Sequence, residues 1–256
     1  MAKALIGYTG FVGGNLDRQQ QFDARYNSKN IHTIGGKHYE LLICAGVPAV
    51  KWLANKEPEQ DRKALAGLRD NLSAVKVDKM VLISTIDVYP QPVDVDENTS
   101  INIELCQPYG KHRLELEQFV AQRFDTTIIR LPGLFGHGLK KNIINDFLHD
   151  NEVYKINPQS VFQFYYLNHL TSDIEIALQN NLNVLNIATE PTSVAEVARV
   201  CLGHEFENTV DTPAARYDFR SRYYELFGGK NGYLYTKQQV LSDLESYVTQ
   251  VRQGEA

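Results

Sequence analysis

Three glycines, each separated from the next by two residues, follow the first apolar run of the chain and could bind a phosphate group. They occur directly after Leu5-Ile6, in the segment Gly7-Tyr8-Thr9-Gly10-Phe11-Val12-Gly13. Gly7 allows a sharp turn out of a strand, Gly10 leaves room for a pyrophosphate, and Gly13 lets the next helix pack close to the sheet. The phosphates would face N–H groups at the positive end of that helix. An ordinary tight turn is the alternative for this motif taken alone.

Short apolar runs alternate with helix-like segments along the rest of the chain. We predict strands over 4–7, 24–28, 40–45, 79–85, 126–131 and 184–188, and helices over 11–21, 58–75 and 108–124. Continuous apolar strands are typical of a parallel sheet that is buried on both faces. Two further helix starts, at Ser193 and Thr236, fit the capping box. The alternation predicts an α/β fold, namely a Rossmann-type doubly wound parallel sheet with a small C-terminal substrate lobe.

The 256 residues are expected to form a single unit, since the sequence has no repeat and no obvious linker. Residues 1–135 are predicted to make the core dinucleotide-binding part. Residues 136–256 are predicted to complete the sheet and form the substrate lobe, and 207–235 are the least regular stretch. Ligand is expected in the crevice between the two parts, outside the carboxyl ends of the strands.

Composition narrows the class of protein. A hydrophobic content of 43% and a charged content of 22% predict a packed core, and the net charge of −5 argues against binding nucleic acid. The three widely spaced cysteines favour a reduced, cytoplasmic protein over a disulfide framework, and no metal site is expected. No apolar stretch approaches a membrane span, and no signal peptide is expected before the first strand.

Three later motifs complete a pattern that resembles a known family. They are Ser84-Thr85-Ile86-Asp87-Val88-Tyr89, Pro108-Tyr109-Gly110 and Arg130-Leu131-Pro132-Gly133-Leu134-Phe135-Gly136. Together with the glycine segment and Cys44-Ala45-Gly46, they follow the order of landmarks in the extended short-chain dehydrogenase/reductases, also called NAD-dependent epimerase/dehydratases. The resemblance spans roughly residues 3–203. The short second-strand region looks most like the dTDP-4-dehydrorhamnose reductase branch.

The resemblance implies a catalytic tyrosine at Tyr109 and an oxygen-holding hydroxyl at Thr85. In that family a lysine four residues after the tyrosine lowers its pKa, whereas this chain has Arg113 there. Arginine keeps the charge but is planar and bonds differently, so the exchange is not conservative. Lys111 would point away from Tyr109 on a helix. An alternative role for Tyr109 is that of an aromatic that packs near the helix start, and Asp87 aligns with an acid that some dehydratases use.

The cofactor is expected to be NADP(H), with NAD(H) as the alternative. An acid at the end of the second strand would bind the ribose hydroxyl and reject a 2′-phosphate, but this chain has Asn27-Ser28-Lys29 there. Ser28 and Lys29 could hold the phosphate, although Lys29 could equally be a solvated loop residue. The remaining cofactor-binding residues implied by the motifs are Thr9, Phe11, Val12, Ala45, Gly46 and Pro132.

The substrate is expected to be a small molecule, with a nucleotide-linked sugar as the leading candidate. Relatives contact such substrates near Lys140, Lys141 and Asn142, and the arginine-rich and aromatic stretch 216–224 suits a diphosphate and a base. Surface charge on an amphipathic segment explains that stretch equally well. Asp94–Glu97 is read as a solvated loop. Trp52 follows the third strand, where relatives line the cofactor or substrate cleft, and it is read as a packing residue. The resemblance allows a homodimer.

Two functions therefore compete. The first is an NADP-dependent oxidoreductase or epimerase/dehydratase in which Tyr109 is the acid/base and Arg113 activates it. The second is a non-catalytic NAD(P)-binding sensor or partner protein that kept the fold and lost the active-site lysine.

Overall fold

The computed structural model describes residues 2–255, which divide into two compact units. Unit 1 comprises Met1–Pro90, Asn98–Leu131 and Leu170–Leu185, and unit 2 comprises Gln91–Glu97, Pro132–His169 and Asn186–Ala256. Each unit has its own hydrophobic core. Within residues 2–255, no helix combines the length and the hydropathy that crossing a membrane requires.

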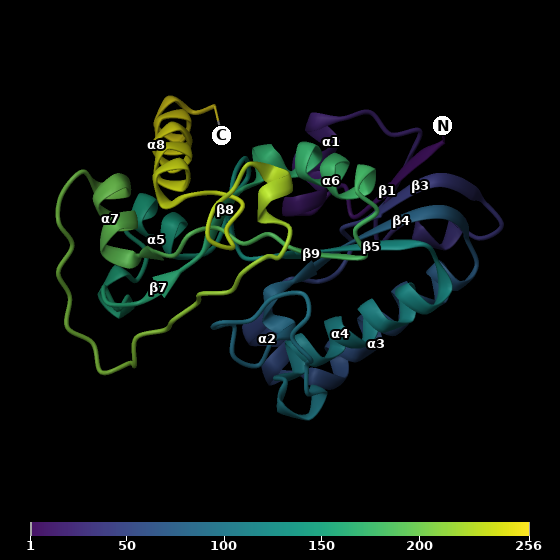
Figure 1. Cartoon of the computed structure of the whole chain (residues 1–256), viewed down its shortest axis with the longest axis horizontal. Helices are drawn as coiled ribbons and strands as arrows, with labels where there is room; N and C mark the ends of the chain where they lie inside the picture. Colours follow the sequence, from purple (N-terminus) through teal and green to yellow (C-terminus); the bar gives the residue numbers. More distant parts are fainter. Residues whose placement is uncertain (1, 256) are drawn as a thin grey trace. The chain divides into compact units, whose positions relative to one another are not determined.

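Unit 1 is built on a six-stranded sheet with the order β2-β1-β3-β4-β5-β9 (Figure 1). The strands are β1 (Lys3–Ile6), β2 (Ala24–Tyr26), β3 (His38–Cys44), β4 (Lys76–Thr85), β5 (Thr126–Leu131) and β9 (Val184–Asn186). The first five pair in parallel, with Ile6 opposite both Tyr26 and Cys44. The chain reverses its direction of travel across the sheet at β1, which has β2 on one side and β3 on the other. Ligands of doubly wound sheets bind at such a switch point.

Helices cover both faces of this sheet (Figure 1). One face carries α1 (Phe11–Gln19) and α6 (Leu170–Gln179), and the other carries α2 (Lys51–Lys56), α3 (Pro58–Ser73) and α4 (Pro108–Arg123). Proline occupies the first turn of both α3 and α4, where its missing N–H costs no hydrogen bond. Short 3-10 turns occur at η1 (Ile31–Thr33), η2 (Ile86–Val88) and η3 (Ile103–Leu105).

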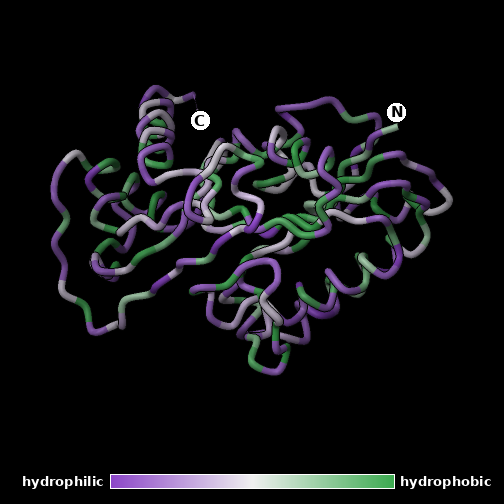
Figure 2. The backbone as a smooth tube through the Cα atoms, in the orientation of Figure 1, coloured by the Kyte–Doolittle hydropathy of each residue, from purple (hydrophilic) through white to green (hydrophobic). Residues whose placement is uncertain are grey.

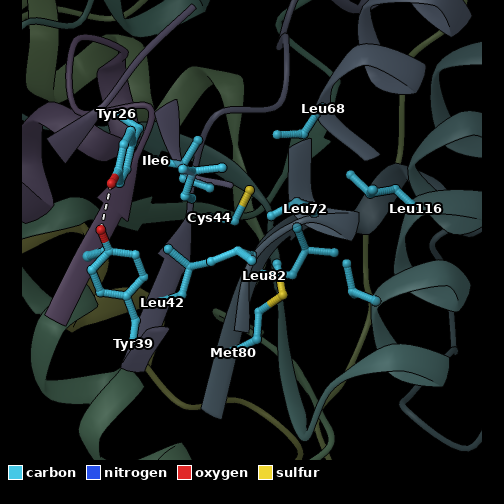
Figure 3. Close-up of a cluster of buried hydrophobic side chains, with 14 of the residues drawn as sticks. Ile6, Tyr26, Tyr39, Leu42, Cys44, Leu68, Leu72, Met80, Leu82 and Leu116 are labelled. Carbon is cyan, nitrogen blue, oxygen red and sulfur yellow. Dashed lines mark hydrogen bonds between the residues drawn. The ribbon is translucent and has the colours of Figure 1, made fainter. Parts of the chain in front are cut away.

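The core of unit 1 forms where the apolar strands meet the inner faces of α3 and α4. Leu42, Met80 and Leu82 of the sheet pack with Leu72 and Leu116 of the helices (Figure 3). The hydroxyl groups of Tyr26 and Tyr39 share a hydrogen bond of 2.5 Å at the edge of this cluster. The central strands form the continuous apolar part of the backbone trace, and polar residues follow the outer turns of the helices (Figure 2).

Unit 2 packs three helices against short strands. Its elements are β6 (Gly133–Phe135), α5 (Ile143–His149), η4 (Val153–Lys155), β7 (Val161–Phe162), β8 (Phe164–Tyr166), η5 (Leu167–His169), β10 (Thr192–Ser193), α7 (Val194–Leu202), η6 (Tyr224–Phe227) and α8 (Lys237–Gln253). Strand β6 pairs with β8, and β7 with β10. Phe135 and Tyr166 stack in its core with ring centroids 5.0 Å apart.

The predicted α/β fold class is confirmed, and so are both capping boxes at Ser193 and Thr236. Several bounds were wrong by a few residues: the first helix ends at Gln19 rather than at 21, and the second strand ends at Tyr26 rather than at 28. The elements that sequence patterns missed are short or depend on tertiary packing, and they are α2, α5, α6, β6, β7, β8 and β10.

Candidate functional site

The glycine segment forms the turn between β1 and α1, as its spacing predicts. Gly7 has φ +90°, and a Cβ there would lie 2.5 Å from the Ala45 carbonyl oxygen. A Cβ on Gly13 would lie 2.1 Å from the Gly7 carbonyl oxygen, so any larger residue would push α1 away from the turn. Both positions therefore require glycine for steric reasons, and Ala45 and Gly46 at the end of β3 form the other wall of the turn.

The start of α1 is suited to an anion. Gly10 is the N-cap residue, and helical hydrogen bonding starts with the amide of Gly14, which donates to the Gly10 carbonyl at 2.7 Å. The amides of the first turn precede that bond, so they have no partner within the helix. Within the described residues no side chain caps α1, and its first turn has no acid. Thr9 and Gly10 are exposed, and Phe11 and Val12 are partly buried beside them.

The end of β2 forms a closed turn that leaves two side chains exposed. The Asn27 amide nitrogen donates to Asn30 Oδ1 at 2.7 Å, and the Lys29 amide donates to Asn27 Oδ1 at 2.9 Å. Asn27 Nδ2 donates to the hydroxyl of Tyr8 at 3.2 Å, which ties this turn to the glycine segment. Ser28 and Lys29 are exposed, and the sequence from 24 to 33 contains no acid.

Tyr109 and Thr85 come together although 24 residues separate them in the sequence. Tyr109 lies in the first turn of α4 and is 8% exposed, and the Thr85 side chain at the end of β4 hydrogen-bonds to its phenol. Thr85 Oγ1 also accepts a hydrogen bond from the Asp87 amide at 3.1 Å. Gly110 permits this approach, because a Cβ there would lie 2.0 Å from the Asp87 carbonyl oxygen.

Arg113 is buried and bound to α3 by a two-pronged ion pair. Its NH1 and NH2 donate to the two carboxylate oxygens of Asp61 at 2.5 and 2.8 Å. NH2 also donates to the Pro48 carbonyl and NH1 to the Tyr109 carbonyl. The guanidinium carbon lies 3.9 Å from the centroid of the Tyr109 ring. Arg113 is thus placed against the ring face, and none of these bonds reaches the phenol hydroxyl.

The acidities of this region follow from burial and charge. Burial raises the pKa of Tyr109 above its ordinary value, and Asp87 adds to this. Arg113, Lys51 and the hydrogen bond from Thr85 pull the same pKa down without cancelling the rise. For Asp61, burial works toward a higher pKa, but the hydrogen bonds and charges of Arg113 and His112 outweigh it and hold the pKa low. Tyr109 is therefore a neutral phenol and Asp61 a carboxylate at neutral pH.

Sequence patterns missed the contribution of α2, which connects the β3 loop to this site. Asn55 Oδ1 accepts from the Tyr109 amide at 2.9 Å, so it caps the start of α4 from outside. Lys51 Nζ forms an ion pair with Asp87 at 2.7 Å. The helix has only six residues and no side-chain cap, so no periodicity signals it. Trp52 on the same helix is 67% exposed, so its interpretation as a packing residue was wrong.

The remaining predicted residues lie in unit 2, and two of them, Asn142 and Arg220, have well-defined structural roles there. Asn142 caps α5 by accepting from the amides of Ile144 and Asn145. Arg220 stacks on the Tyr233 ring at 4.3 Å and pairs with Asp218, although Arg216 and Arg222 are exposed. Lys140 and Lys141 are exposed, and Pro132 is partly buried directly after β5.

The interpretation of Asp94–Glu97 as a solvated loop was wrong for Glu97. Its carboxylate accepts from the Asn186 amide, the Ser221 hydroxyl and the Arg222 amide, at distances of 2.7 to 2.9 Å. All three donors follow Glu97 by about ninety residues or more along the chain, so no local pattern could have indicated them. Across residues 2–255, no three His, Cys, Asp or Glu side chains gather into a group that could hold a metal ion.

Neither protein-family models nor curated proteins match this sequence. Solved structures do match over nearly its whole length. A dTDP-4-dehydrorhamnose reductase from Clostridium acetobutylicum superposes with a TM-score of 0.75 at 16% identity, covering 98% of this chain and 100% of the other. The Bacillus anthracis enzyme of the same name, in complex with NADP, gives 0.73 at 16% identity, with 98% and 99% covered. MoeE5, in complex with UDP-glucuronic acid and NAD, gives 0.75 at 16% identity, with 99% and 100% covered.

At these identities the likeness establishes the fold. The resemblance to the dTDP-4-dehydrorhamnose reductase branch is confirmed at the level of the fold, over 98% of this chain. The chain has the Rossmann-type α/β fold shared by the nucleotide-sugar reductases and their structural relatives.

Proposed function

We propose that this protein is an NADP(H)-dependent oxidoreductase or epimerase/dehydratase that acts on a nucleotide-linked sugar, with Tyr109 as its acid/base. The placement of Thr85, at the end of β4, beside Tyr109, in the first turn of α4, carries the proposal. Both residues belong to the same unit as the glycine turn, and both are positioned by backbone elements rather than by long flexible side chains. Solved structures of this fold include a reductase with NADP and a protein with a UDP-sugar and NAD.

The residues present fit a dinucleotide. Gly10 has only one atom near the position of a Cβ, the Gly7 carbonyl oxygen at 3.3 Å, so the space beside the first turn of α1 is open. The unpaired amides of that turn would hold the pyrophosphate. Ser28 and Lys29 would hold a 2′-phosphate, because both are exposed beside Asn27 and no acid opposes the charge. This second fit is the reason for preferring NADP(H) to NAD(H).

Tyr109 is suited to donate a proton. When bound, the nicotinamide cofactor supplies or accepts a hydride. The phenol is neutral at neutral pH because burial raises its pKa, so it can protonate a substrate oxygen. Thr85 would hold the same oxygen with its hydroxyl. In the opposite direction Tyr109 would have to act as a base, and the neutral phenol would first have to lose its proton, which the same burial opposes.

A second function is favoured by a specific observation, the ion pair between Arg113 and Asp61. The charge of Arg113 is compensated by a carboxylate with two hydrogen bonds, whereas the resemblance calls for a lysine that activates the tyrosine. A protein that binds the dinucleotide without turnover, as a sensor or an assembly partner, would retain the glycine turn and still tolerate this arrangement.

Calorimetric titration with NADPH and NADH tests the cofactor proposal. Wild type should bind NADPH more tightly than NADH, and Gly10→Asp should abolish binding of both by filling the pyrophosphate space and adding a negative charge. Gly67→Asp is the matched control, because it adds the same charge on α3 at a position where a Cβ meets nothing. Tighter binding of NADH than of NADPH would refute the cofactor preference.

Incubation with NADPH and a panel of keto-sugar nucleotides tests turnover. Tyr109→Phe should lower the rate by about 10²–10⁴-fold, which is the usual contribution of a positioned acid/base. Tyr154→Phe is the control, since Tyr154 is 66% exposed and lies in unit 2. A wild-type protein that binds NADPH but turns over no member of the panel, with Tyr109→Phe indistinguishable from it, supports the non-catalytic function instead.

A further inference from the structure

The side chain of Tyr8 joins the two halves of the proposed cofactor site. Tyr8 follows Gly7 in the glycine turn, and its hydroxyl oxygen accepts a hydrogen bond from Asn27 Nδ2 at 3.2 Å. Asn27 is the first residue after β2, and the adjoining strand ends are bound by the Gly7 amide, which donates to the Tyr26 carbonyl at 2.7 Å. Tyr8 therefore reaches from the turn suited to the pyrophosphate to the turn suited to the adenosine ribose.

The hydrogen bonds around Asn27 settle which end of its side-chain amide faces Tyr8. Its Oδ1 accepts from the Lys29 main-chain amide at 2.9 Å, and its own main-chain amide donates to Asn30 Oδ1 at 2.7 Å. Asn30 Nδ2 donates in turn to the Arg25 carbonyl at 3.0 Å, which holds the turn closed. Because the Lys29 amide needs an acceptor, the carbonyl end of Asn27 faces Lys29 and the NH₂ end faces Tyr8.

The side-chain groups that remain available at this turn can all donate hydrogen bonds. The NH₂ group of Asn27 has a second hydrogen besides the one given to Tyr8. The Tyr8 hydroxyl accepts that bond, so its own hydrogen is not used in it. Ser28 adds a hydroxyl and Lys29 an ammonium group, and both residues are exposed. The side-chain oxygen of Asn27 is already directed to the Lys29 amide.

No carboxylate opposes these donors. Residues 24–33 contain no acid, and within the described part of the chain no carboxylate pairs with Lys29. Arg25, the other cation of this region, is compensated by Asp17 at 2.5 Å and also donates to the Phe22 carbonyl. Several donors beside one uncompensated cation suit a phosphate, whereas a ribose diol is held by an acceptor such as a carboxylate.

We propose that Tyr8 is a specificity-determining residue for the 2′-phosphate of NADP(H). Its hydroxyl donates to the phosphate, and the same hydroxyl holds the donor end of the Asn27 amide toward that group. The inference rests on the proposed function, since it adds a residue to the proposed cofactor site. Tyr8 occupies one of the positions between the motif glycines, where the spacing restricts no residue type, so the sequence pattern did not single it out.

Calorimetric titration of the full-length protein with two probes tests the inference. The probes are AMP and adenosine 2′,5′-bisphosphate, which differ only in the 2′-phosphate, and wild type should bind the bisphosphate more tightly. Tyr8→Phe keeps the ring and should weaken bisphosphate binding by about 10–100-fold, which is typical for loss of a hydrogen bond to a charged group. Its affinity for AMP should stay close to that of wild type. Tyr154→Phe, at an exposed tyrosine in unit 2, is the matched control.

A second variant tests the hydrogen-bonding character of the turn. Asn27→Asp has nearly the same size but replaces the donor group that faces Tyr8 with a charged acceptor. It should reverse the preference, so that AMP binds more tightly than the bisphosphate, because a carboxylate accepts from the ribose hydroxyl groups and repels the phosphate.

The outcomes separate this inference from the proposed function. A ratio of the two affinities that is the same in wild type and Tyr8→Phe overturns the inference, and it leaves the proposed function intact because Ser28 and Lys29 would then suffice for the phosphate. An equal loss for both probes in Tyr8→Phe also overturns it, since the hydroxyl would then act only on the shape of the glycine turn. A selective loss of bisphosphate binding in a protein that turns over no substrate supports the inference and overturns the proposed catalysis alone.

Discussion

Helix α4 is held to its neighbours by two buried arginine clusters. They are alike in composition, but they differ in whether the hydroxyl group of the adjoining tyrosine takes part in the cluster. In the first, Arg113 of α4 pairs with Asp61 of α3, and in the second, Glu117 of α4 pairs with Arg130 of β5. The four side chains are at most 7% exposed. Each guanidinium also lies over a tyrosine ring, at 3.9 Å for Tyr109 and 5.0 Å for Tyr89.

The two clusters differ at the tyrosine hydroxyl. Arg130 donates from NH1 to the Tyr89 hydroxyl at 2.8 Å, and its Nε donates to Glu117, which also accepts from Ser84. Arg113 donates instead to main-chain carbonyls and to Asp61. Among residues 2–255, no acceptor pairs with the buried Nε of Arg113. The Arg130 cluster therefore uses the tyrosine hydroxyl as part of the fold, whereas the Arg113 cluster uses only the ring.

The comparison shows that a buried arginine can hold a tyrosine ring in place while its hydroxyl group stays available for reaction. Tyr109 is fixed from three sides, by the Arg113 guanidinium on its ring, by Asn55 on its amide and by the helix itself. Its hydroxyl stays within reach of Thr85. Preorganisation of this kind is what a proposed acid/base residue requires, because a small displacement of a reacting group costs a large part of its rate.

The largest effect is expected from breaking either ion pair, and it should be similar for both. Asp61→Ala and Glu117→Ala should each lower the free energy of unfolding by about 3–5 kcal/mol, because each leaves a buried guanidinium without its carboxylate. Urea denaturation followed by circular dichroism measures this. The double variant Glu117→Leu/Arg130→Met should recover most of the loss, since apolar replacement of a whole buried pair is often neutral. A loss below about 1 kcal/mol in one single variant would show that its cluster is not a structural equivalent of the other.

A smaller effect should distinguish the two tyrosines. Tyr89→Phe should cost about 1–3 kcal/mol, because it removes the acceptor of the Arg130 hydrogen bond in a buried position. Tyr109→Phe should cost less than about 1 kcal/mol, because the ring contact with Arg113 survives and the removed hydroxyl bonds only to another hydroxyl group. The same denaturation experiment compares them. An equal cost for both would contradict the assignment of a structural hydroxyl to Tyr89 and an available one to Tyr109.

The parts of the site that could be predicted from the sequence are those fixed by local backbone geometry. Gly7 and Gly13 were predicted at the turn because their roles depend on a spacing of a few residues, and the structure places main-chain atoms where their Cβ atoms would lie. Both capping boxes are equally local. Tyr109 and Thr85 could be proposed as partners only through a resemblance between motifs, since nothing in the intervening residues indicates their contact.

The parts that escaped prediction depend on contacts between distant segments. Lys51 and Asp87 are 36 residues apart, and Arg113 and Asp61 are 52 residues apart. No periodicity encodes such pairs, and α2, with only six residues, is too short to show a helical pattern in the sequence. Arg113 was proposed as the activator of Tyr109 from its position in a motif, and that role stays a proposal. The structure adds that its guanidinium has a carboxylate partner, which the sequence could not reveal.

The smallest and most specific effect concerns acid, and it tests whether the Arg113 cluster acts through charge. Asp61 has a pKa held below the ordinary 3.8 in the folded protein, so folding is stabilised by its ionised form at higher pH. This contribution should be complete above 3.8 and should decline as pH falls through the folded-state pKa, by at most about 1.4 kcal/mol per pH unit for one proton. The difference in unfolding free energy between wild type and Asp61→Asn should therefore shrink in acid. Asp70→Asn, an exposed position on the same helix, controls for the loss of one carboxylate from the net charge. A difference in unfolding free energy that stays constant throughout the acid range would show that Asp61 holds Arg113 by shape and hydrogen bonding alone. The two arginine clusters would then be alike in geometry but not in the contribution of charge.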